Sequence, residues 1–146
     1  MQNAVRKLIL LGITNLMILV SCSPHDSSNI PIGPPVQIRG RIALINESGV
    51  SIRVVGYTQT RGETQMSVNL GIHLAPGQDY YLHNLIETNM GQVFLGGDIV
   101  QVDYVAEEPD PDHPSQPLFR DSVTLTVNGT FYIQVKNGGS YSIYPG

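Results

Sequence analysis

The clearest indication of the fold class is Met66-Ser-Val-Asn-Leu-Gly-Ile-His-Leu74. Apolar residues stand at every even position of this stretch, and Ser, Asn, Gly and His stand at the odd positions. Strict alternation with a period of two is typical of a β-strand with one buried face and one face in water. We therefore expect a strand over residues 66–74, with its even side facing a core.

The same alternation recurs on both sides of this strand, and no helical periodicity competes with it. The expected strands cover residues 36–44, 50–54, 80–86, 93–95, 99–105, 123–127, 130–135 and 141–144. Seven to nine short strands with turn residues between them predict an all-β fold, an antiparallel β-sandwich over residues 36–146. A closed barrel is the alternative.

Several turns can be placed from residue type. Ala75-Pro-Gly-Gln78 suits a type II turn, and Asn46 to Gly49 and Lys136 to Gly139 also reverse the chain. At Asn128-Gly129, side-chain parity favours a three-residue loop that pairs Leu125 with Phe131 and Val123 with Ile133. This register predicts a hairpin with a β-bulge and a left-handed Gly129.

The end of the chain resembles the closing hairpin of prealbumin-like sandwich modules, such as carboxypeptidase-regulatory-like domains. The matching positions are Gly129, Phe131, Ile133, Gly139, Tyr141 and Ile143. Gly40-Arg-Ile42, the turn ending at Gly49, and Ile52 with Val54 are similar to the first hairpin of these modules. Val135 and the long middle of the chain depart from the pattern. The resemblance implies a sandwich that acts as a spacer, stalk or accessory domain.

Residues 1–21 have the layout of a secretory signal peptide: Arg6 and Lys7, then an apolar run from Leu8 to Val20, then the small Ser21. Leu19-Val20-Ser21-Cys22 resembles the lipobox of bacterial lipoproteins, which implies that Cys22 is lipidated and becomes the first mature residue. The 13-residue run is short for a membrane-spanning helix, which needs about 20 residues. An uncleaved helix and an ordinary secretory leader are the alternatives.

Residues 22–35 are rich in Ser, Pro and Gly and predict a flexible tether between the lipid and the sandwich. Without Arg6 and Lys7, the expected mature chain has six basic against twelve acidic residues, a formal charge of −6. This balance argues against nucleic-acid binding and leaves the lipid as the contact with the membrane. Ser23 after the cysteine favours the outer membrane of a bacterial cell envelope, by the same resemblance.

The segment 106–117, with its four prolines, predicts a long solvated loop. Carboxylates in and near it could hold calcium, although the spacing of an EF-hand is absent. These candidate ligands are Asp103, Glu107, Glu108, Asp110 and Asp112, with His113 beside them. His73 and His83 would lie together as the start of a zinc site if Leu74 paired with Tyr80.

The sequence contains no nucleophile elbow and no constellation of catalytic residues, so we expect neither an enzyme nor a cofactor. Seven tyrosines are the main resource for binding, and we expect at least half of them to fill the core. The sequence therefore predicts a lipid-anchored envelope module that binds a protein partner. The alternative is a lipoprotein that binds calcium or a small molecule.

Overall fold

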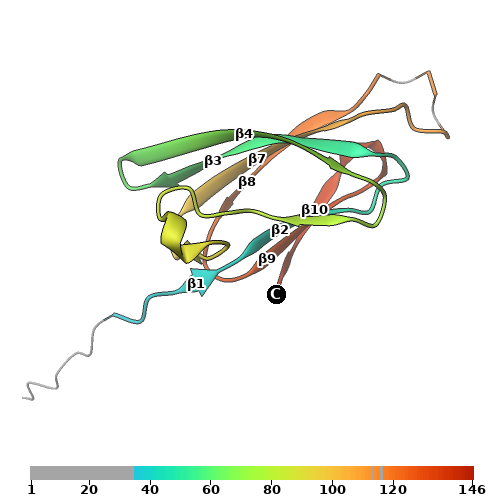
Figure 1. Cartoon of the computed structure of the whole chain (residues 1–146). Helices are drawn as coiled ribbons and strands as arrows, with labels where there is room; N and C mark the ends of the chain where they lie inside the picture. Colours follow the sequence, from blue (N-terminus) through green and yellow to red (C-terminus); the bar gives the residue numbers. More distant parts are fainter. Residues whose placement is uncertain (1–34, 113, 116) are drawn as a thin grey trace, which may run out of the picture. The chain divides into compact units, whose positions relative to one another are not determined.

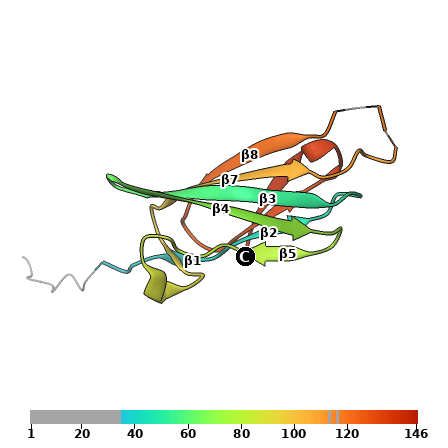
Figure 2. The ribbon, with the colours of Figure 1, turned by 45° about the horizontal axis from the view of Figure 1, so that its top comes forward.

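Two four-stranded sheets face each other as layers in the computed structural model, which describes residues 35–112, 114–115 and 117–146. One sheet has the strand order β10-β9-β2-β5 and is called the β2 sheet below; the other, β4-β3-β7-β8, is called the β3 sheet. Figures 1 and 2 show the two layers. Both sheets are open at their edges, so the all-β sandwich is confirmed and the closed barrel is not.

The described residues contain ten strands and two 3₁₀ helices, joined by turns and loops. They are β1 Arg39–Gly40, β2 Ile42–Asn46, β3 Ile52–Arg61, β4 Thr64–Leu74, β5 Asp79–Tyr81, η1 Thr88–Met90, β6 Phe94–Leu95, β7 Ile99–Ala106, β8 Arg120–Thr126, β9 Phe131–Val135, η2 Asn137–Gly139 and β10 Tyr141–Pro145. The count exceeds the expected seven to nine because the strand expected over 36–44 is divided at Arg41 into β1, which pairs with β6, and β2. No helix among these elements is long and apolar enough to cross a membrane.

The core lies between the sheets and is built from alternate residues of each strand. The largest side chains with no exposed surface are Tyr104, Phe94, Ile42, Leu44, Ile52, Leu82 and Ile133. One pairing departs from the antiparallel expectation: β2 runs parallel to β9, with Leu44 opposite Ile133.

Several expected strands differ in the structure. The strand expected over 80–86 is only β5, which ends at Tyr81, and β3 continues to Arg61, well past the expected end at Val54. In β4 the even side chains do face inward, but Met66 is 44% exposed, because β4 is an edge strand that the opposite sheet covers only partly. The first strand is also shorter than expected: the ladder begins at Arg39, and Ile38 is 50% exposed.

The turns after Asn46, Leu74 and Thr126 were expected to close hairpins, and all three instead carry the chain from one sheet to the other. The 75–78 turn itself is confirmed, since Gln78 N donates to Ala75 O at 3.0 Å and Gly77 has φ of 84°. The prediction of a hairpin between β8 and β9 is wrong because the two strands lie in different sheets, and Gly129 is not left-handed. Parity predicts which side chains face inward but cannot tell a hairpin from a crossing between facing sheets.

The β9–β10 hairpin is confirmed, with Tyr141 opposite Val135 and positive φ at Gly138 and Gly139. The expected signal peptide, Cys22 and all of the 22–35 tether except its last residue lie outside the described residues.

A bulge at Val55 changes which side chains of β3 face inward. Val54 pairs with Tyr104 and Gly56 with Asp103, so Val55 is an extra residue against β7. Before the bulge Ile52 and Val54 are buried, and after it the inward positions are odd, with Tyr57 and Gln59 buried. The bulge therefore turns polar residues of β3 into the space between the sheets.

Candidate functional site

The five candidate calcium ligands do not converge. Glu107 lies 2.7 Å from His73 Nδ1 and 4.0 Å from Arg53 Nε. Glu108 accepts the Ser51 N–H at 3.0 Å. No three His, Cys, Asp or Glu side chains in the described parts of the chain come together as metal ligands.

The other three candidate ligands are Asp103, Asp110 and Asp112. Asp110 accepts the backbone N–H of Asp112 at 2.9 Å, and Asp103 lies on β7, before the loop begins. His113 lies outside the described residues. Calcium binding by this loop therefore stays a prediction.

The condition for the zinc pair, a pairing of Leu74 with Tyr80, is not met. Leu74 pairs with Ile52 in the β3 sheet, and Tyr80 pairs with Leu44 in the β2 sheet. The step between sheets separates His73, which bonds to Glu107, from His83, which is exposed beyond β5. The premise of the zinc pair is thereby removed.

The outer face of the β2 sheet carries a row of four paired residues, called the tyrosine row below: Tyr81, Ala43, Tyr132 and Tyr144. Ala43 pairs with Tyr81 on one side and with Tyr132 on the other, and Tyr132 pairs with Tyr144. The side chains of Ile42 and Leu44 are buried on the opposite face, so the row faces outward. Ala43 is nevertheless only 1% exposed, which shows that larger neighbours cover it.

Interactions along the tyrosine row shift the pKa values of its hydroxyl groups. The neighbouring Tyr132 raises the pKa of Tyr81, first by its charge and also by a hydrogen bond between the two side chains. Hydrogen bonds to Ser142 and Lys136 lower the pKa of Tyr144. Lys136 Nζ lies 5.9 Å from the centre of the Tyr144 ring, within range of a cation–π contact.

Fewer tyrosines fill the core than expected. Only Tyr57 and Tyr104 are buried, and Tyr141 and Tyr144 are 41% and 43% exposed. Burial raises the pKa of Tyr57 to about 12. The other five tyrosines keep part of their side chains at the surface, and the expectation that at least half would be core is wrong.

β10 forms an open edge of the β2 sheet next to the tyrosine row. It pairs only with β9, and no other described strand lies beyond it. Its five residues carry no charge, and Ile143 is 38% exposed. Soluble proteins usually protect edge strands with charges or bulges, so an uncharged aromatic edge marks a surface suited to pairing.

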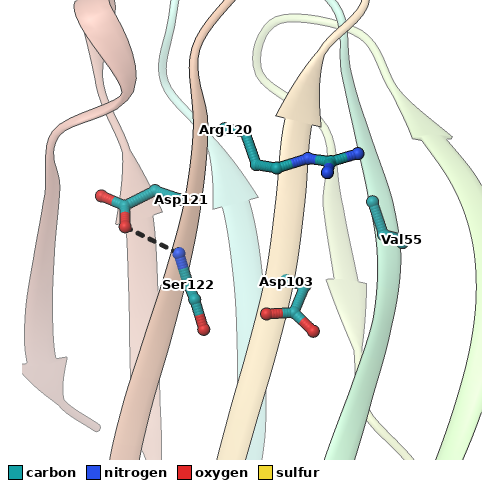
Figure 3. A pocket seen from close by; sticks show the side chains of 5 residues that line it. All are labelled: Val55, Asp103, Arg120, Asp121 and Ser122. Carbon is teal, nitrogen blue, oxygen red and sulfur yellow. Dashed lines mark hydrogen bonds between the residues drawn. The ribbon is translucent and has the colours of Figure 1, made fainter.

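The outer face of the β3 sheet has a different surface. A depression of about 410 Å³ is lined by Val55, Asp103, Arg120, Asp121 and Ser122. Figure 3 shows the Arg120 side chain extending from β8 across β7 toward Val55, with the Asp103 carboxylate on the same side and Asp121 turned away. The depression has an apolar side, a cationic donor and an anionic acceptor.

A row of hydroxyl and amide side chains runs across the β3 sheet beside this depression and is called the polar row below. Thr58 pairs with Ser67 and with Gln101, and Gln101 pairs with Thr124. The Thr58 and Ser67 hydroxyl oxygens lie 2.8 Å apart, and Gln101 Nε2 donates to Ser122 Oγ at 2.9 Å. All four residues of the row are uncharged at any physiological pH.

A buried polar cluster lies where β3 ends. The Asp98 carboxylate has no exposed surface and accepts from Arg61 Nε at 2.6 Å, Gln59 Nε2 at 2.9 Å and Leu95 N at 3.1 Å. Burial alone would raise the pKa of Asp98, but these hydrogen bonds and the Arg61 charge outweigh it, and the pKa lies below its usual value.

The same cluster holds the segment between β5 and β6 against β3. Gln59 Oε1 accepts the Leu85 N–H at 2.6 Å, and Gln59 Nε2 donates to Asn84 Oδ1 at 3.0 Å. Arg61 also contacts Glu87 at 2.9 Å. Both oxygens of Asp98 are occupied within the protein, so we assign this cluster to structure and not to binding.

The sequence did not indicate that Gln59 and Arg61 face inward, because the bulge at Val55 reverses the alternation on which such a prediction depends. The depression was missed for a related reason, since Arg120 and Val55 are far apart in sequence and meet only across β7. The polar row did leave a trace in the alternating Thr residues of β8.

No protein-family model matches this chain, and no curated protein matches it. The assignment of function therefore depends on the surfaces described above.

Proposed function

We propose that this chain is a non-enzymatic, lipid-anchored module of the bacterial cell envelope that binds a protein partner through the β2 sheet. One observation carries the binding part of the proposal: the tyrosine row leads across the sheet to an uncharged, exposed edge strand. Tyrosine is enriched in protein interfaces because it combines a large apolar area with a polar tip.

Strand addition at β10 explains how such a partner would bind. An extended segment of the partner would form main-chain hydrogen bonds to the open edge of β10. Its side chains on one face would then meet Tyr144, and those on the other face would meet Tyr141 and Ile143. This arrangement uses both the aromatic area and the unpaired backbone.

Photo-crosslinking in the native host tests this face against the opposite one. A photoreactive phenylalanine analogue at Tyr144 should give a specific adduct with one envelope protein, and the same analogue at Thr124 should not. Ile143→Lys, which places a charge on the edge, should abolish the Tyr144 adduct. Equal adducts at both positions, or an adduct that survives Ile143→Lys, would contradict the proposal.

The anchor has its own test, which does not depend on the partner. Mass spectrometry of the mature protein should find an acylated Cys22 as its first residue, and Cys22→Ser should release the protein from the membrane fraction. A bare thiol at Cys22, or an intact Met1, would contradict lipidation. The signal for lipidation is the Leu19-Val20-Ser21-Cys22 motif and its place after the apolar run.

A further inference from the structure

We propose that the outer face of the β3 sheet binds a neutral polysaccharide strand, with the depression at Val55 as the anchoring subsite and the polar row as its continuation. The proposal concerns the face opposite to the tyrosine row and does not require the partner proposed above. The bulge at Val55 interrupts the regular pairing of β3 with β7 at the place where the depression lies.

The groups around the depression match the chemistry of a sugar ring. Val55 offers an apolar patch for C–H groups, the Asp103 carboxylate accepts hydrogen bonds from hydroxyls, and the Arg120 guanidinium donates them. Arg120 forms no ion pair within the described residues. Figure 3 shows the guanidinium and the carboxylate on the same side of β7, so one ring could contact both.

The polar row extends this chemistry across the sheet. Ser67, Thr58, Gln101 and Thr124 occupy four neighbouring strands, which span about 14 Å at roughly 4.8 Å per strand. Gln101 also donates to Ser122 at the depression, so the row and the depression are continuous. Hydroxyl and amide groups can donate or accept, as the hydroxyls of a polysaccharide require.

An amino acid or a small ion would use this surface less well. Either could be held only by Arg120 and Asp103, and attraction between charges that water reaches contributes little. An extended neutral chain adds many weak hydrogen bonds along the row. The absence of a charged side chain from the polar row also favours a neutral polymer over an anionic one.

Affinity electrophoresis of the full-length protein in detergent tests the proposal. The gels would contain hydroxyethyl cellulose, pullulan or glycol chitin as neutral probes, and polygalacturonate as the anionic probe. At least one neutral polymer should retard the protein more than polygalacturonate does. Arg120→Ala should weaken that retardation about tenfold, which corresponds to the loss of a hydrogen bond to a charged group.

Matched variants separate this face from the rest of the molecule. Arg41→Ala, which removes one exposed guanidinium beside the β2 sheet, and Tyr144→Ala should both leave retardation unchanged. Thr58→Val keeps the shape of the side chain while removing one hydroxyl of the row, and it should weaken retardation by a smaller factor than Arg120→Ala.

Three outcomes would overturn the proposal. They are no retardation by any neutral polymer, equal retardation of the wild type and Arg120→Ala, and retardation by polygalacturonate alone. Suppression of the retardation by glycine at low millimolar concentration would show an amino-acid site and would also overturn it. A failure here leaves the crosslinking test at Tyr144 unaffected, because Tyr144 lies on the other sheet.

Discussion

The outer faces of the two sheets have the same geometry and opposite chemistry. Each carries one row of four paired residues across four strands, with Tyr81, Ala43, Tyr132 and Tyr144 on the β2 sheet and Ser67, Thr58, Gln101 and Thr124 on the β3 sheet. The inner faces of both sheets are mainly apolar, and the polar cluster around Gln59 and Asp98 is the exception at the end of β3. The core therefore accounts for the fold, while the outward positions divide the surface into an aromatic face and a hydrogen-bonding face.

Two tertiary contacts of the sandwich are also made by different means. β3 ends in an ion pair between Arg61, whose side chain is 25% exposed, and the fully buried carboxylate of Asp98. β1 and the start of β9 meet through a close backbone contact, in which a Cβ on Gly40 would lie 1.8 Å from the Gly129 carbonyl oxygen. The ion pair and the backbone contact can be tested separately by mutation, and so can the two outer faces.

The largest effect is expected when the Arg61–Asp98 ion pair is broken. Arg61→Met leaves the Asp98 carboxylate buried without its positive partner, which should lower the free energy of unfolding by about 3–5 kcal/mol. Urea denaturation measures the change. Glu87→Gln removes only the more exposed contact of Arg61 and should cost less than about 1 kcal/mol. Equal losses of unfolding free energy in both variants would show that the Arg61–Asp98 pair does not stabilise the end of β3.

Gly40→Ala should have the next largest effect. The added methyl group would collide with backbone, which cannot rotate away as a side chain can, so we expect a loss of about 1–3 kcal/mol. Gly129→Ala is the matched control, because a Cβ at Gly129 meets nothing within 4 Å and should change stability by less than about 0.5 kcal/mol. Similar melting temperatures for the two variants would argue against the close contact.

Acid should weaken the β3 sheet through Asp98. The pKa of Asp98 is lowered in the folded protein, so its contribution to stability is present above the unfolded value of about 3.9 and is lost as the pH falls through the folded value. One such group changes the free energy of unfolding by at most about 1.4 kcal/mol per pH unit. Unfolding measured between pH 6 and pH 2 should therefore be less steep in Asp98→Asn, and an unchanged slope would contradict the assignment.

The smallest effect concerns the tyrosine row alone. Tyr132→Phe removes the hydroxyl that raises the pKa of Tyr81, so the pKa of Tyr81 should fall toward its ordinary value of about 10. Titration followed by tyrosine-ring NMR signals resolves the change. Thr58→Val, on the polar row, should leave the Tyr81 titration where it is. A shift in Thr58→Val instead would show that the two faces are coupled.

Much of the fold could be predicted because strand alternation is a local property. The strand at 66–74, the type II turn at 75–78 and the closing hairpin after Val135 all follow from residues that are neighbours in sequence. The candidate surfaces were harder to predict. Seven tyrosines indicated a capacity for binding, but nothing local could show that Tyr81, Tyr132 and Tyr144 lie in one row across the four strands of one sheet.

The order of residues was enough to predict an all-β chain, the places of its main turns and the inward side chains of most strands, since each depends on a period of two and on turn residues. Which sheet each strand joins became known from the folded chain alone, because a turn residue reverses the chain without choosing between pairing within a sheet and crossing to the other sheet. The tertiary structure also decided the parity of β3 beyond Val55, where one extra residue moves Gln59 and Arg61 inward. Both decisions depend on partners distant in sequence, and they place the tyrosine row and the polar row on opposite faces.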